Sequence, residues 1–271
     1  MPVPIANNTR VFLRVIAFYL LTVFVFVATD SLASTGITRN IRLLLAVAGT
    51  LVLVYFFCRT EPLSMRDAGL IPDAKTIYRL SAGMGAGLGM AAIQLWALKT
   101  WGHITITANA LPASVVMSYV LLFLLLALRE EIVFRSYTLQ TLCRTAGPVP
   151  GQLFILVIFV LEHLLGGMNL ITAVIGSGTG ALLFGIAAVK SKGIGLPLGL
   201  HFGWNTGQWL WGLKNMPGCT IISVEKGYAL QAEIIGLSAF FITATITILF
   251  IYLYYRKNTD GNAVPAKRKV I

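Results

Sequence analysis

The chain has 271 residues, of which 57% are hydrophobic and only 11% charged, and its mean hydropathy is +0.81. A soluble domain usually carries about 25% charged residues, so this composition excludes an ordinary soluble protein and indicates a membrane protein. The net charge of +11 comes from basic residues in short loops and at the C-terminal end, where they can meet anionic lipid headgroups, so nucleic acid is not an expected partner.

Apolar stretches long enough to cross a bilayer, about 20 residues each, predict an all-α, polytopic transmembrane helix bundle of about eight helices. The expected ranges are 10–29, 41–58, 77–98, 113–143, 152–166, 169–190, 195–213 and 232–255. The boundary at Gly166 and Gly167 is not sharply marked in the sequence, so the number of helices can be seven or eight. The fourth range is too long for one straight span, which predicts a cytoplasmic extension or a break after Arg135. We expect a single transmembrane domain over residues 1–271, with a basic cytoplasmic tail at 256–271.

The distribution of positive charge predicts the orientation of the bundle. If the N-terminus is cytoplasmic, 16 of the 21 Lys and Arg residues fall on the cytoplasmic side, in agreement with the positive-inside rule. Both termini are therefore expected in the cytoplasm. The third range carries Gly83, Gly85, Gly87 and Gly89, two overlapping small-xxx-small pairs that predict close approach of another helix.

The most unusual stretch is Leu128–Arg135, where four charged residues follow a long apolar run. An ionisable residue at the bilayer centre costs roughly 2.5–3.5 kcal/mol on insertion scales, so a specific use is expected. Glu131 and Arg135 are spaced i,i+4 and share a helix face, whereas Glu130 is turned about 100° away. This geometry predicts a structural pair, Glu131 with Arg135, and a working carboxylate, Glu130.

Two later helices carry polar residues at the same spacing. Phe159 and His163 are four residues apart, as are His201 and Asn205. A lone buried histidine is often only a satisfied core residue. At about 1.5 Å rise per residue, however, Glu130, His163, His201 and Asn205 lie roughly 9–22 Å from the expected cytoplasmic helix ends, so all four could meet in one chamber open toward the cytoplasm.

The ordered set Glu-Glu-x-x-x-Arg, Phe-x-x-x-His and His-x-x-x-Asn resembles the CAAX protease and bacteriocin-processing (CPBP, or Abi) family, whose best-known relatives are the CAAX prenyl endoproteases. The resemblance covers about residues 114–211, the expected catalytic core helices. It implies that Glu130 and His163 activate a water, with Glu130 as general base. It further implies that His201 and Asn205 stabilise the oxyanion, that Glu131 and Arg135 hold the helix, and that Phe159 packs the site wall.

The cofactor expectation is a metal-free mechanism, with a zinc-dependent version as the alternative. Glu130, His163 and His201 have the ligand types of a catalytic zinc site. Against zinc, the chain lacks a His-Glu-x-x-His signature, and Asn205 suits an oxyanion role better than ligation. Glu162, a further intramembrane carboxylate beside His163, falls outside the family pattern and stays unassigned.

The expected function is intramembrane cleavage of a membrane-associated peptide or protein in the inner (plasma) membrane of a prokaryote, with the lipid bilayer as the other partner. Prenylated CAAX substrates do not follow, because bacterial relatives process or protect against peptides. One alternative is a non-catalytic immunity or scaffold protein of the same family. Another is a small transporter with buried charges along a solute path, but the inverted repeat typical of many transporters is not found.

Overall fold

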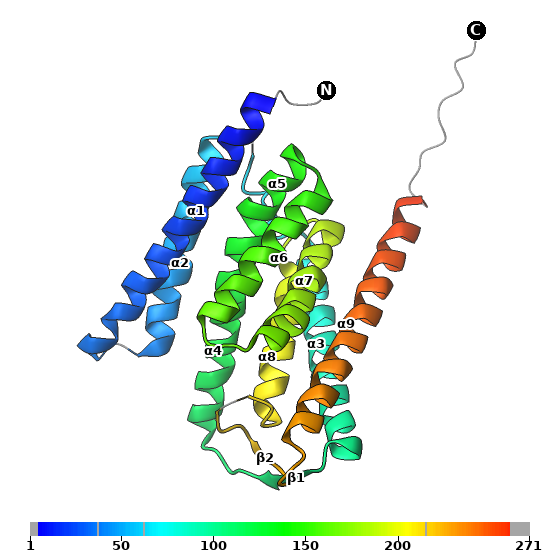
Figure 1. Cartoon of the computed structure of the whole chain (residues 1–271). Coiled ribbons are helices and arrows are strands. Elements are labelled where there is room, and N and C mark those ends of the chain that lie inside the picture. The colour runs from blue at the N-terminus through cyan, green and yellow to red at the C-terminus, as the bar shows by residue number, and fades with distance from the viewer. Residues whose placement is uncertain (1–4, 37, 62, 215, 261–271) are drawn as a thin grey trace.

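The computed structural model describes residues 5–36, 38–61, 63–214 and 216–260, and it confirms a helical bundle (Figure 1). The α-helices of these residues are α1 (Ile5–Ser31), α2 (Arg39–Arg59), α3 (Thr76–Trp101), α4 (Ala113–Glu131), α5 (Leu139–Thr145), α6 (Pro148–Leu165), α7 (Gly178–Ser191), α8 (Gly195–Leu210) and α9 (Ala229–Asp260). Within the described residues, seven helical segments are long and apolar enough to cross a membrane, so the chain is a multi-pass membrane protein. The predicted basic tail lies outside the described residues from position 261 onward.

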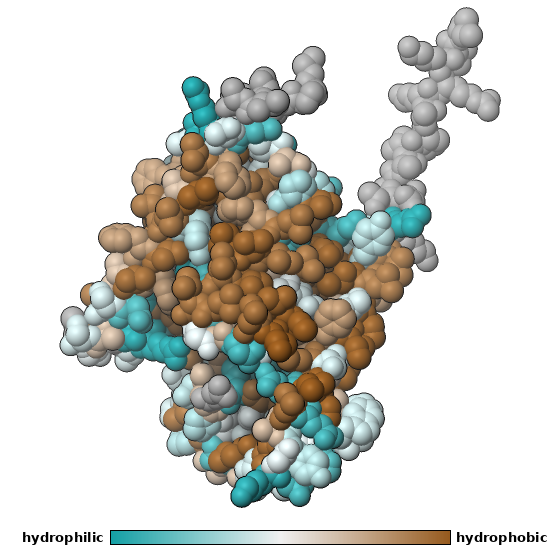
Figure 2. All heavy atoms as spheres, viewed as in Figure 1, coloured by the Kyte–Doolittle hydropathy of each residue, from teal (hydrophilic) through white to brown (hydrophobic). Residues whose placement is uncertain are grey.

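The bundle has an apolar surface, unlike a soluble protein, and a few charged side chains lie in its otherwise apolar interior. Figure 2 shows apolar side chains covering much of the visible face of the helices. Phe24 is 68% exposed and Phe250 67%. By contrast, Arg129, Glu131 and Arg135 are all buried inside. A bilayer accepts the apolar surface, and intramembrane charges usually face a protein interior for functional reasons.

The long fourth range is interrupted where a break was expected. A π-helical turn, η2 (Ile132–Thr138), joins α4 to α5. Ser136 has φ −87° and ψ −107°, which is not helical, and its hydroxyl donates to the Ile132 carbonyl. The Thr138 hydroxyl donates to the Val133 carbonyl at 2.6 Å. These serine and threonine hydroxyls satisfy backbone carbonyls in the irregular turn, which directly follows the paired carboxylates and is buried throughout.

Helices α3 and α8 pack with their backbones in close contact, as the glycines of α3 predict. A Cβ added at Gly87 would meet the Leu200 carbonyl oxygen, and would lie only 2.6 Å from the Trp204 nitrogen. Gly203 on α8 faces Met84 of α3 in the same way. Glycine is required at these positions because the opposing backbone occupies the space of a side chain. This packing positions α8 and the residues it carries.

A two-stranded ribbon joins the ends of distant helices, and the sequence prediction does not contain it. Strands β1 (Ile104–Ala108) and β2 (Thr220–Val224) pair antiparallel, with Ile104 opposite Val224 and Ala108 opposite Thr220. The ribbon lies at one end of the bundle, at the bottom of Figure 1, where β1 is part of the α3–α4 connection and β2 is part of the α8–α9 connection. It ties these two connections together.

Candidate functional site

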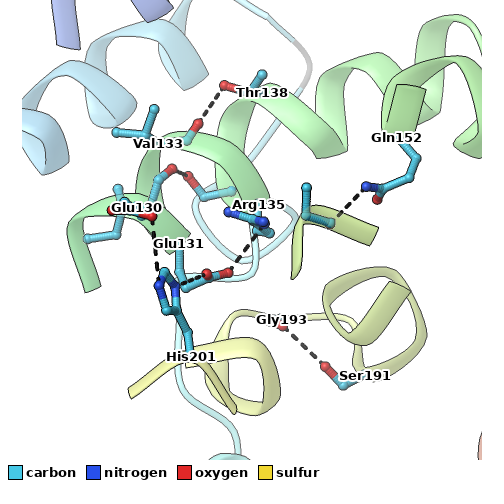
Figure 3. A network of polar contacts seen from close by, with 12 residues as sticks. Glu130, Glu131, Val133, Arg135, Thr138, Gln152, Ser191, Gly193 and His201 are labelled. Atoms are coloured by element: carbon cyan, nitrogen blue, oxygen red, sulfur yellow. Dashed lines mark hydrogen bonds and ion pairs between the residues drawn. The ribbon is translucent and has the colours of Figure 1, made fainter. Parts of the chain in front are cut away.

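The last turn of α4 carries two adjacent carboxylates with different surroundings. Glu131 is fully buried, and its Oε2 lies 3.5 Å from the Nε atom of Arg135. Its other oxygen, Oε1, lies 2.9 Å from Nδ1 of His201 on α8 (Figure 3). Glu131 therefore stands between a guanidinium and an imidazole. The expected pairing with Arg135 is present, and the bond to His201 adds a link between α4 and α8.

Glu130 faces the opposite side of the same imidazole ring. Its Oε2 lies 3.8 Å from Nε2 of His201, too far for a direct hydrogen bond. Among the described residues, Oε2 of Glu130 is buried and has no hydrogen-bond partner. The side chain as a whole is 18% exposed, whereas that of Glu131 is 0% exposed. Glu130 is thus the less enclosed carboxylate, and its Oε2 accepts no hydrogen bond within the described chain.

Both nitrogens of His201 face carboxylates, which fixes the direction of the ring. When Nδ1 carries the hydrogen and donates it to Glu131, the Nε2 atom faces Glu130. In the protonated ring, Nε2 also carries a hydrogen and becomes a donor. The ring of Phe184 stacks on His201, with centroids 4.6 Å apart and an interplanar angle of 13°. Phe184 was missed in the sequence, where it resembles any other apolar residue of its helix.

Arg135 is held by aromatic rings as well as by Glu131. Its guanidinium carbon lies 4.8 Å from the ring centre of Phe159 and 5.4 Å from those of Phe134 and Phe184. Cation–π attraction of this kind is stronger where water is excluded, and Arg135 is fully buried. Phe159 therefore forms part of the site wall, and it does so by covering Arg135.

His163 occupies a separate position on α6. Its Nδ1 lies 2.8 Å from the carbonyl oxygen of Phe159, one turn earlier, so Nε2 is free to act as a proton acceptor. The ring centres of His163 and Phe159 are 4.5 Å apart. In the described part of the chain, His163 makes no hydrogen bond or ion pair with Glu130, His201 or Asn205. The structure thus orients His163 but does not join it to the Glu130 cluster.

Asn205 lies one turn after His201 on α8 and is partly exposed. Its side-chain amide has no hydrogen-bond partner among the residues that the structure describes. A free amide next to an oriented imidazole is suited to donating a hydrogen bond to a ligand oxygen. The structure therefore brings Glu130, Glu131, Arg135, Phe159 and His201 into one connected group, with Asn205 adjacent on the helix that carries His201.

Glu162, which the sequence left unassigned, has a partner on the first helix. The hydroxyl of Tyr19 donates to its Oε1 at 2.8 Å. Nearby on α4, the guanidinium of Arg129 stacks 4.2 Å above the ring of Phe26, which also belongs to α1. These two contacts attach α1 to the helices of the site. No sequence signal indicated them, because Tyr19 and Phe26 lie in an otherwise uniform apolar run.

Zinc would need at least three suitable side chains close together. Within residues 5–36, 38–61, 63–214 and 216–260, no group of three His, Cys, Asp or Glu side chains could hold a metal ion. Glu130 and His201 approach each other, but His163 does not complete a ligand set with them. The metal-free mechanism and its zinc-dependent alternative both stay predictions.

Comparison with known proteins identifies the segment that carries the site. The model of a family described as type II CAAX prenyl endopeptidase, Rce1-like, matches residues 112–207. The matched segment begins just before α4 and ends within α8, so it contains every site residue proposed from the sequence. The resemblance to the CAAX protease family is confirmed. None of the curated proteins and none of the solved structures matches the chain.

Proposed function

We propose that this protein is an intramembrane peptidase that uses Glu130 as its general base, and the match of residues 112–207 to the model of type II CAAX prenyl endopeptidases, Rce1-like, supports this proposal. The observation that carries the proposal is the unequal setting of the two carboxylates. Glu131 is fully buried, with Oε1 bonded to His201 and Oε2 in ion-pair contact with Arg135, whereas Glu130 is 18% exposed and makes no hydrogen bond within the described chain. A base must have an oxygen available to accept a proton.

The proposed reaction is hydrolysis of a peptide bond by a water bound between Glu130 and His163. Glu130 accepts a proton as the water oxygen bonds to the peptide carbonyl carbon, and the carbonyl oxygen becomes an oxyanion. His201, through Nε2–H, and Asn205, through its amide, donate hydrogen bonds to that oxyanion. The C–N bond then breaks, and the proton held by Glu130 passes to the leaving amine.

The surroundings of these groups support this division of roles. Phe184 and Glu131 prevent the His201 ring from turning, so that its Nε2 stays directed to the Glu130 side. Fixed donors in a site with little water stabilise developing charge without reorganising during the reaction. The proposed substrate is a membrane-associated peptide or protein. The protein is proposed to lie in the inner membrane of a prokaryote.

The first test is cleavage of an internally quenched peptide by the purified protein in liposomes. Glu130→Gln should lower kcat by at least about 100-fold, the usual range for loss of a general base, without lowering the melting temperature. Glu225→Gln, a change at an exposed loop carboxylate, is the matched control and should leave kcat unchanged. Cleavage that survives Glu130→Gln would contradict the mechanism.

The same preparation separates the alternatives. If a strong chelator removes activity and added zinc restores it, the zinc-dependent version of the protease is correct and the water is activated by metal. If the wild-type protein cleaves nothing, and Glu130→Gln, His163→Ala and His201→Ala all keep the cellular phenotype, the protein acts as a non-catalytic immunity or scaffold protein.

A further inference from the structure

A small cavity opens where two loops meet the first turns of α3 and α8. It has a volume of about 240 Å³. The α2–α3 loop contributes residues 69–73, and the turn between α7 and α8 contributes residues 192–194. Typical pockets for drug-sized ligands hold roughly 300–1,000 Å³, so this cavity has room for a small polar group rather than for a whole lipid molecule.

The two loops are held together through their backbones. The Ile194 amide donates to the Gly69 carbonyl at 3.2 Å. Gly69 has φ +74°, and a Cβ added there would lie 2.7 Å from the Gly193 Cα atom, so this approach requires glycine. The Ser191 hydroxyl donates to the Gly193 carbonyl at 3.2 Å (Figure 3). The loop walls of the cavity are therefore fixed by backbone contacts.

Two cations and one carboxylate line the cavity. Lys192 is exposed and, among the residues that the structure describes, makes no ion pair and no side-chain hydrogen bond. Arg79 donates from Nη1 to Oδ2 of Asp73 at 2.8 Å, and its side chain is 19% exposed. A guanidinium has five N–H donors, so Arg79 can bind Asp73 and a second oxygen anion at the same time. The lining therefore carries a net positive charge.

The carboxylate of Asp73 is already bonded within the protein. Its Oδ1 accepts hydrogen bonds from the Thr76 hydroxyl at 2.8 Å and from the Lys75 amide at 3.0 Å. The Thr76 hydroxyl, and then Arg79, hold the pKa of the Asp73 carboxyl below its usual range, so it stays ionised at neutral pH. Because both oxygens already accept hydrogen bonds, Asp73 attracts an ammonium less strongly than a free carboxylate would. The cavity therefore favours an anion.

The rim of the cavity is apolar and exposed. Ile71 lines the cavity and is 46% exposed. Ile77 and Tyr78, in the first turn of α3, are 77% and 67% exposed. Because α3 is long and apolar enough to cross a membrane, large apolar side chains with this exposure face lipid. An anion in the cavity would thus lie beside a surface that acyl chains can cover.

The cavity shares helices with the candidate site but not its residues. Leu128 on α4 and Leu198 on α8 line it, two positions before Glu130 and three before His201. None of the proposed catalytic residues lies in its wall. A ligand of this cavity is therefore distinct from the peptide at the candidate site.

We propose that this cavity binds the phosphate of an anionic phospholipid, held between Lys192 and Arg79, with the acyl chains along the exposed apolar side chains of α3. Basic pockets between membrane helices on the cytoplasmic side suit acidic headgroups, and the charge distribution predicts that side for this end of the bundle. A free phosphate could meet the same cations, but the apolar rim favours a ligand that also carries acyl chains. The inference goes beyond the proposed function and does not depend on peptidase activity.

Lipid binding to the full-length protein in detergent, measured by native mass spectrometry, tests the inference without requiring turnover. Dioleoyl phosphatidylglycerol should bind at least about 5-fold more tightly than dioleoyl phosphatidylcholine, the usual contribution of one basic residue near an anionic lipid surface. Lys192→Asn should remove most of this preference, and asparagine tolerates the left-handed backbone at this position, where φ is 56°. Lys75→Asn, the same change at an exposed lysine outside the cavity wall, should leave the preference intact.

A second variant fills the cavity without changing its charge. Leu198→Phe places a larger side chain in the wall and should weaken the binding of phosphatidylglycerol as Lys192→Asn does. Inorganic phosphate added in excess should not displace the lipid, because it has no acyl chains. Melting temperatures in lipid-free detergent show whether each variant is folded.

Each other outcome counts against the site. If the wild type binds phosphatidylglycerol and phosphatidylcholine equally, the cavity does not select an anion. Equal losses with Lys192→Asn and Lys75→Asn would show a general effect of surface charge. Displacement by inorganic phosphate would show a phosphate site that does not need lipid. If Lys192→Asn lowers the melting temperature, Leu198→Phe decides, and a preference that survives in this variant contradicts the proposal.

Discussion

The two adjacent glutamates show how one turn of helix separates structure from chemistry. Glu131 has two partners and no exposed surface, whereas Glu130 is partly exposed with a free oxygen. Removing one member of a buried ion pair usually costs about 3–5 kcal/mol, because the other charge is left uncompensated. The two residues should therefore respond differently to the same substitution.

Glu131→Ala should lower the free energy of unfolding by about 3–5 kcal/mol, because it strands the guanidinium of Arg135 among aromatic rings. Glu130→Ala should leave unfolding nearly unchanged while removing activity. Thermal unfolding of both variants in the same detergent checks this. A pair of equally destabilised variants would mean that Glu130 is structural too.

At this scale the sequence predicted the residue types and the pairing of Glu131 with Arg135, since both follow from spacing along a single helix. It could not show that His201 bonds to Glu131, because that contact depends on how α4 and α8 rotate against each other. The contact of Tyr19 with Glu162, 143 positions apart, was out of reach for the same reason.

Among the elements, the crossing of α3 and α8 determines where His201 and Asn205 lie. The sequence showed two possible small-residue pairs on α3, and the structure uses one of them. Gly83 and Gly87 face the backbone of α8, whereas added Cβ atoms at Gly85 and Gly89 meet nothing within 4 Å. Spacing alone could not distinguish these faces, because both pairs have the same period.

This difference gives a matched pair of variants. Gly87→Ala should destabilise the protein by about 1–3 kcal/mol, since its Cβ would clash with the α8 backbone, and it should also lower activity by displacing His201. Gly85→Ala places the same methyl group one face away and should be neutral or slightly stabilising, because alanine favours helix. Melting temperatures and initial rates check both. Equal loss in the two variants would show that the α3–α8 contact is not specific.

Over the whole molecule, the positions of the long apolar helices were the most predictable feature, because apolar length is set by the bilayer, while their ends differ from the predicted ranges by several residues. The π-helical turn after α4 also appeared where excess length required a break. The ribbon of β1 and β2 was missed because each strand has only five residues and its partner lies more than 100 positions away. Strand pairing of this kind leaves no local pattern.

Orientation in the membrane remains a prediction from charge. Lys226, beside β2, is expected on the outer side, and Arg66, between α2 and α3, on the cytoplasmic side. A membrane-impermeant maleimide added to intact cells should label Lys226→Cys, in a background without native cysteines. Arg66→Cys should react only after the membrane is opened. The reverse labelling pattern would show that the bundle has the opposite orientation in the membrane.

The ribbon also has a consequence for the order in which the protein is made. The strands flank the family-matched segment on both sides, at 104–108 and 220–224. Their pairing closes a loop of more than 100 residues, which has an entropic cost and requires β2 to have been synthesised. A nascent chain that ends before residue 220 would carry Glu130, His163, His201 and Asn205 without this closure. The ribbon can therefore form only after residue 224 has been synthesised, later than every residue of the proposed site.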